Sequence, residues 1–221
     1  MIGGKLVALG DSFTEGYGDD CDGEPCRSWV HHLVEQERTV NPKFEATNLA
    51  RYGADLSTVA AQQVPRAVAE GADLATLIAG ANDVRAQSWD PQRFAELLRL
   101  GVRELQTYGA RVVLGNVPDF ALTLPVRELS VKLALQVRIV EANQIIAGVA
   151  CDGGLQLLDF ASLPATRDLR NHSRDLIHPN ARGYRVVATT IHAELSDWCH
   201  QSRSVGDYPN RDVQRGAFDE N

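Results

Sequence analysis

Two short polar segments carry residue types that together could perform acyl transfer at a serine. Gly10-Asp11-Ser12 places a hydroxyl directly after an apolar run, and Asp175 precedes His178 by three positions. A serine hydroxyl becomes a nucleophile when a histidine accepts its proton and a carboxylate orients that histidine. Side chains three apart on a helical turn lie on one face, about 5–6 Å apart at Cβ. The spacing therefore predicts Ser12 as nucleophile, His178 as base and Asp175 as the orienting acid.

The start of a helix would add a further component at the same place. A glycine before the Asp11-Ser12 pair permits a tight turn from a strand into a helix. The first amides of a helix are free, and the helix dipole favours negative charge beside them. Ser12 is thus expected to serve both as the attacking group and, through its amide, as an oxyanion donor.

An apolar, strand-like run stands ahead of each polar segment that could carry this chemistry. Five such runs alternate with helical patterns, and parallel neighbours in a sheet need the crossover connections that helices supply. We therefore expect an α/β fold of three α/β/α layers, with a five-stranded parallel sheet in flavodoxin-like order. The expected strands cover residues 5–10, 44–49, 74–79, 111–115 and 155–159.

Helical periodicity is expected over residues 28–38, 56–70, 91–108, 128–150 and 181–198. Pro65 should kink or restart the second of these helices. In the fourth, the apolar positions that mark the period are Leu129, Leu133, Val137, Val140 and Ile145. Ligands of such sheets bind beyond the carboxyl ends of the strands, which is where the polar segments fall.

Length and charge limit the classes of protein to consider. The 221 residues predict one domain over 1–200 followed by a polar tail over 201–221. The formal charge of −7 and the lack of a segregated basic face disfavour a nucleic-acid partner. No apolar run approaches the roughly 20 residues of a membrane span, and no signal peptide precedes the first strand, so a cytoplasmic location is expected. The oligomeric state is open.

Four cysteines are present, and their spacing with the histidines suggests no zinc site. Cys21 and Cys26 bracket a short polar loop and would pair only if oxidised, so this pairing stays open. Neither a metal nor a cofactor is expected. The expected partner is a small-molecule, lipid or carbohydrate ester.

The sequence resembles the SGNH/GDSL hydrolase family over nearly the whole domain. The resemblance rests on four segments in order, which are Val7-Ala8-Leu9-Gly10-Asp11-Ser12-Phe13-Thr14-Glu15-Gly16, Asn48-Leu49-Ala50-Arg51-Tyr52-Gly53, Gly80-Ala81-Asn82-Asp83 and Asp175-Leu176-Ile177-His178-Pro179-Asn180. It implies a GDSL-type esterase or lipase without a cofactor, in which Ser12 attacks and Asp175 and His178 supply the acid and the base. By the same resemblance, the amide of Gly53 and the side chain of Asn82 complete the oxyanion hole. A glycine is common in the family where this chain has Ala50.

Each segment also has a plainer interpretation. Asp11 would tether the turn, Asp83 would be a structural partner, Asn82 would cap a helix, and Gly53 would occupy a left-handed turn. Two functional alternatives also remain at this point. An acyltransferase would use the same triad with an acceptor other than water, and a binding module on the same fold would be catalytically silent.

Overall fold

The computed structural model describes residues 2–204, and side chains as far as residue 200. Its centre is a parallel sheet of strand order β2-β1-β3-β4-β5, so the expected α/β class and flavodoxin-like order are confirmed. β1 and β3 are rich in Leu, Val and Ala and buried along nearly their whole length, as strands covered on both faces must be. The strands span Lys5–Gly10, Glu45–Asn48, Leu74–Ile78, Arg111–Gly115 and Gln156–Leu158.

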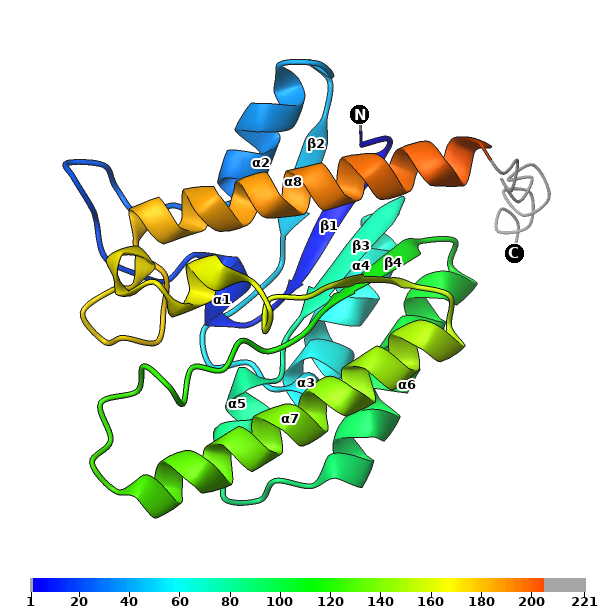
Figure 1. Ribbon diagram of the computed structural model, residues 1–221. Coiled ribbons are helices and arrows are strands. Elements are labelled where there is room, and N and C mark those ends of the chain that lie inside the picture. Colours follow the sequence, from blue (N-terminus) through cyan, green and yellow to red (C-terminus); the bar gives the residue numbers. More distant parts are fainter. Residues whose placement is uncertain (1, 205–221) are drawn as a thin grey trace.

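Helices cover both faces of the sheet (Figure 1). α2 (Trp29–Arg38) and α8 (Ala181–Ser204) pack together on one face, over an apolar core that includes Trp29 and Tyr184. The other face carries α3 (Leu56–Thr58), α4 (Val64–Ala69), α5 (Ala81–Arg85), α6 (Pro91–Thr107) and α7 (Leu129–Asp152). The short α1 (Ser12–Glu15) follows β1, and 3₁₀ turns at Pro164–Arg167 and Leu169–Asn171 interrupt the loop before α8.

The single helix expected over 56–70 is composite. A π-helical turn, Val59–Gln63, separates α3 from α4, and Pro65 falls in the first turn of α4 as a restart requires. α8 runs to Ser204, so residues 201–204 of the expected tail are helical. The remainder of that tail lies outside the described residues.

The buried face of α7 differs from the one that its period suggested. Leu129, Leu133, Val137 and Val140 are each more than half exposed. The helix instead buries Leu135, Ile139, Ala142, Ile146 and Val149 against the sheet and its neighbouring helices. Both stripes are apolar, so the sequence pattern cannot distinguish them.

The apolar character of α7 also bears on the membrane question. It is the one helix of the described chain that is long and apolar enough to cross a bilayer, by length and composition only. Charged residues interrupt the sequence of α7, so the expectation that no continuous apolar run reaches this length is not contradicted, and the absence of a membrane span stays a prediction. A helix that covers one face of a doubly wound sheet can pass the same test.

Candidate active site

The polar segments converge at the carboxyl edge of the sheet. Ser12 follows β1, Gly53 lies in the loop after β2, and Asn82 lies in α5 just after β3. His178 comes from the loop between β5 and α8. Parallel strands end at one edge, so segments far apart in sequence meet there.

Gly10 makes the turn into α1 possible. Its φ of 154° is unfavourable for other residues, and a Cβ there would lie 2.1 Å from the carbonyl oxygen of Ile78 on β3. The buried Gln63 side chain bonds to both backbone groups of Gly10. Its oxygen accepts from the Gly10 amide at 2.8 Å, and its nitrogen donates to the Gly10 carbonyl at 2.9 Å.

Sequence reasoning did not identify Gln63. The residue lies on the π-helical turn between α3 and α4, and no motif marks it. Its position 53 residues beyond Gly10 becomes meaningful only when the two segments are packed together.

Asp11 caps α1, as the plainer interpretation expected. Its carboxylate accepts from the Phe13 amide at 3.0 Å while its own exposure is only 3%. Burial raises the pKa of Asp11 to about 7, the charge of Asp83 adds to this, and the Phe13 hydrogen bond partly offsets it. Asp11 is thus a buried carboxyl that binds protons near neutral pH.

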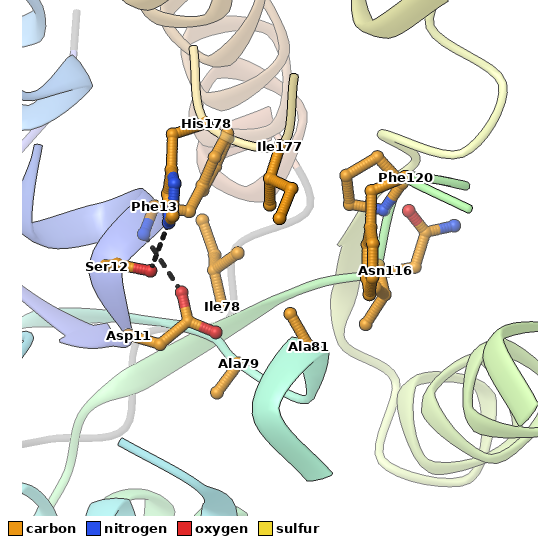
Figure 2. Close-up of a pocket in the computed structure, with 12 residues that line it drawn as sticks. Asp11, Ser12, Phe13, Ile78, Ala79, Ala81, Asn116, Phe120, Ile177 and His178 are labelled. Atoms are coloured by element: carbon orange, nitrogen blue, oxygen red, sulfur yellow. Dashed lines mark hydrogen bonds between the residues drawn. The ribbon is translucent and has the colours of Figure 1, made fainter. Parts of the chain in front are cut away.

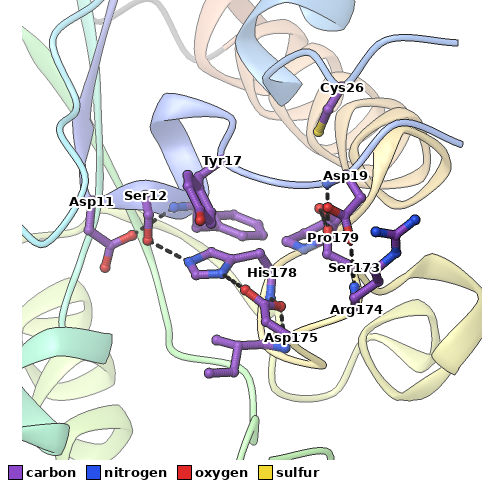
Figure 3. Close-up of polar contacts among 12 residues, drawn as sticks. Asp11, Ser12, Tyr17, Asp19, Cys26, Ser173, Arg174, Asp175, His178 and Pro179 are labelled. Carbon is purple, nitrogen blue, oxygen red and sulfur yellow. Dashed lines mark hydrogen bonds and ion pairs between the residues drawn. The ribbon is translucent and has the colours of Figure 1, made fainter.

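Ser12, His178 and Asp175 form one hydrogen-bonded path (Figure 3). The Ser12 hydroxyl lies 2.8 Å from His178 Nε2, although 166 residues separate them in sequence. His178 Nδ1 lies 2.5 Å from Asp175 Oδ2. The structure therefore brings together the three residues for which the sequence predicted nucleophile, base and orienting acid, in the geometry those roles need.

Asp175 is held as a carboxylate by its neighbours. Burial disfavours its charge, but hydrogen bonds from the His178 ring and from the amides of His178 and Ile177 outweigh that effect, so the pKa of Asp175 is lowered. An ionised Asp175 accepts from Nδ1–H and leaves Nε2 of the same ring free to accept a proton from Ser12.

The three groups predicted to bind the oxyanion differ in whether they already have a hydrogen-bond partner. The amides of Ser12 and Gly53 donate to no other described residue. Gly53 adopts a left-handed φ of 75°. This conformation is compatible with an amide that donates to an oxyanion and also with a simple left-handed turn. Asn82 directs its amide nitrogen to the Ala54 carbonyl at 2.9 Å, so one of its two amide hydrogens is already used.

Asp83 has the structural role that the plainer interpretation gave it. Both of its carboxylate oxygens lie 3.2 Å from the Leu56 amide at the start of α3. Burial raises the pKa of Asp83 to about 6, and the charge of Asp55 adds to this. The hydrogen bond from the Leu56 amide lowers the pKa and partly offsets both effects.

A mostly apolar pocket of about 50 Å³ opens beside Ser12 (Figure 2). Ser12 and His178 lie at one end and Phe120 at the other, and Phe13, Ile78, Val117 and Ile177 line its walls. Sequence analysis did not predict this pocket, because its walls come from four separate segments. The pocket can hold an apolar group within reach of the serine.

All four cysteines are free, including Cys21 and Cys26. Burial raises the pKa of the Cys26 thiol to about 11, and the charges of Asp20 and Asp19 add to this. Among the described residues, no three His, Cys, Asp or Glu side chains gather as metal ligands would.

The sequence comparisons find relatives over most of the chain. Residues 8–186 match the model of the GDSL-like Lipase/Acylhydrolase family. A GDSL-like esterase of Mycobacterium tuberculosis is 30% identical over an alignment of 204 residues, and the match covers 87% of this chain and 62% of that protein. The chain therefore spans less than two thirds of this curated relative.

Solved structures share the fold at lower identity. The psychrotrophic esterase EstA of a Pseudoalteromonas species superposes with a TM-score of 0.71 at 15% identity, covering 89% of this chain and 98% of the esterase chain. The acetylxylan esterase Axe2 of Geobacillus stearothermophilus gives a TM-score of 0.68 at 17% identity, covering 88% of this chain and 94% of that chain. At these low sequence identities, the structural similarity shows a shared fold alone.

Proposed function

This chain belongs to the GDSL-like lipase/acylhydrolase family, and we propose on that premise that it hydrolyses carboxylic esters through an acyl-enzyme on Ser12. The observation that carries the proposal is the hydrogen-bonded path from Ser12 through His178 to Asp175. A catalytically silent binding module does not require the Ser12 hydroxyl to lie 2.8 Å from His178 Nε2 beside an apolar pocket, so this contact favours an enzyme.

The first half of the reaction forms the acyl-enzyme. Ser12 Oγ attacks the ester carbonyl carbon while its proton passes to His178 Nε2. The negative charge of Asp175 stabilises the imidazolium that results. The carbonyl oxygen becomes an oxyanion, whose proposed donors are the amides of Ser12 and Gly53 and the second amide hydrogen of Asn82.

Collapse of this intermediate breaks the bond between the carbonyl carbon and the alcohol oxygen. His178 returns its proton to that oxygen, so the alcohol leaves and the acyl group remains on Ser12. A water molecule then attacks the acyl carbon with His178 again as base. The acid leaves, and Ser12 regains its proton.

The pocket beside Ser12 supports a short acyl group. Its walls are apolar, so they favour a hydrocarbon chain over a charged group. A cavity of about 150 Å³ holds benzene, so a pocket a third as large suits about two to four carbons. Longer chains would have to extend beyond this pocket.

A panel of p-nitrophenyl esters of graded chain length tests the activity and the acyl preference together. We expect turnover to fall beyond the short acyl groups. Ser12→Ala should lower kcat by several orders of magnitude and abolish labelling by a fluorophosphonate. Ser130, an exposed serine of α7, provides the control, because Ser130→Ala should change neither. Labelling that persists in the Ser12→Ala protein would refute the assignment of the nucleophile.

A further inference from the structure

Two exposed tyrosines lie beside His178. The side chains of Tyr17 and Tyr52 are 50% and 62% exposed, and their ring centroids are 4.8 Å apart. The Tyr17 ring lies 4.8 Å from the His178 ring, and the Tyr52 ring lies 6.2 Å from it. Figure 3 shows Tyr17 next to the Ser12–His178 pair. An aromatic surface at this position is available to a ligand.

Hydrogen bonds hold the main chain that carries these rings. The Tyr52 amide donates to the Glu15 carboxylate at 2.6 Å, and the Tyr17 carbonyl accepts from the Tyr184 hydroxyl at 2.9 Å. Both contacts hold the main chain and leave the rings outside. The main-chain positions of both tyrosines are therefore set before any ligand arrives, which lowers the entropic cost of binding.

The mechanism decides which part of an ester would meet the rings. His178 protonates the departing alcohol oxygen, so the alcohol lies on the histidine side of the reacting carbon. The apolar pocket that suits the acyl group is lined by Phe13 and Phe120 and by neither tyrosine. The alcohol portion is the part left to contact Tyr17 and Tyr52.

Polar groups continue from the tyrosine pair. Gly53, which follows Tyr52, forms part of the wall of a polar cavity of about 300 Å³ between α3 and α6. The hydroxyls of Ser57 and Ser88, also in that wall, bond to no other described side chain or backbone group. Arg93 also lines this cavity, and within the described part of the chain its guanidinium pairs only with an exposed glutamate, at 4.0 Å.

We propose that Tyr17 and Tyr52, with the adjoining polar cavity, form a subsite for an alcohol that is a sugar ring. A sugar presents an apolar C–H face that packs on aromatic rings and an edge of hydroxyls that bind polar groups. A simple aryl alcohol would use the rings alone, and an alkyl alcohol would use neither surface. This assignment deepens the proposed ester hydrolysis and rests on it.

Three acetate esters that share one acyl group test the subsite, namely ethyl acetate, phenyl acetate and a monoacetylated methyl glucopyranoside. We expect the wild-type protein to prefer the sugar ester by kcat/KM. Tyr52→Leu should lower the ratio of kcat/KM for the sugar ester to that for ethyl acetate by about three- to tenfold, chiefly through KM. The Ser57→Ala/Ser88→Ala double variant should lower the same ratio.

Tyr108→Leu is the matched control, since Tyr108 is 68% exposed at the far end of α6, and the ratio should stay unchanged. An equal loss on all three esters in Tyr52→Leu would mean that the ring acts by holding His178, which overturns the subsite. A second combination of results would also overturn the subsite. In it, the double variant leaves the ratio unchanged, and Tyr52→Leu lowers kcat/KM for phenyl acetate as much as for the sugar ester.

A binding measurement separates this proposal from the esterase proposal. Methyl glucopyranoside, a non-reacting probe, is titrated into the wild-type protein while the Tyr17 and Tyr52 ring signals are followed by NMR. Shifts at these rings that Tyr52→Leu abolishes support the subsite, even if no ester is hydrolysed. Hydrolysis of ethyl acetate with no such shifts refutes the subsite and leaves the esterase intact.

Discussion

Replacing Asn82 by alanine tests whether its side chain binds the oxyanion. In the described residues this side chain makes one hydrogen bond, in which its amide donates to the Ala54 carbonyl at 2.9 Å. Ala54 follows Gly53, so the same bond steadies the loop that presents the Gly53 amide. The second amide hydrogen of Asn82 is the one assigned to the oxyanion. The substitution removes both interactions at once, and their consequences appear in different measurements.

The two interactions have different magnitudes. One partly buried amide-to-carbonyl hydrogen bond contributes about 0.5–1.5 kcal/mol to the free energy of unfolding. One oxyanion donor contributes about 10²–10³ to kcat, or roughly 3–4 kcal/mol, because its bond strengthens as negative charge grows in the transition state. We therefore expect Asn82→Ala to lower kcat by that factor, to leave KM nearly unchanged, and to destabilise the fold only slightly.

Urea unfolding and initial-rate kinetics on one preparation of the variant separate the two contributions. Asn41 provides the control, because its amide donates to the Ile2 carbonyl far from the site. Asn41→Ala should cost a similar free energy of unfolding and leave kcat intact. An Asn82→Ala protein that is destabilised but keeps full kcat per folded molecule would refute the oxyanion role.

Three further predictions concern the surroundings of Ser12. Gln63→Leu leaves the Gly10 amide buried without a partner, so urea unfolding should show a loss of about 2–4 kcal/mol, together with reduced kcat. Asp11 has a pKa of about 7 in the fold against 3.8 for the free side chain, so its contribution to stability is greatest below the lower value and is lost as pH rises to the higher one. Asp11→Asn keeps an acceptor for the Phe13 amide, and its melting temperature should fall less between about pH 4 and pH 8 than that of the wild type. Activity should survive EDTA, and a loss that zinc reverses would contradict the metal-free mechanism.

The sequence predicted the sheet well because its strands are distinctive. The runs that form β1, β3 and β4 are short, apolar and buried along nearly their whole length, and they locate the edge of the sheet where the polar residues gather, whereas β2 and β5 are more exposed. The family and the strand order are confirmed. The roles of Ser12, His178 and Asp175 stay predictions, although the structure places the three side chains in one hydrogen-bonded path.

What the sequence could not supply depends on contacts between distant segments. Two apolar stripes on α7 compete, and only its packing against the sheet shows that Ile139 rather than Val137 is buried. Gln63 acts on Gly10 through a π-helical turn that periodicity cannot reveal. No sequence pattern distinguishes Tyr17 and Tyr52 from ordinary loop residues, and only the structure shows their rings beside His178.

The loop that carries His178 needs support from outside itself, because loops alone hold catalytic groups poorly. That support comes from the segment after α1. The Asp19 amide donates to the Ser173 hydroxyl at 2.8 Å, and the Asp19 carboxylate accepts from the Arg174 amide at 2.7 Å. The Asp19 carbonyl also accepts from the first amide of α8 at 3.0 Å. Since Ser12 begins α1 and Asp19 follows closely in the same chain segment, one piece of backbone sets the positions of both Ser12 and His178. The 2.8 Å contact between Ser12 and His178 is thus a property of two docked segments, and a change in either one alters the geometry of both.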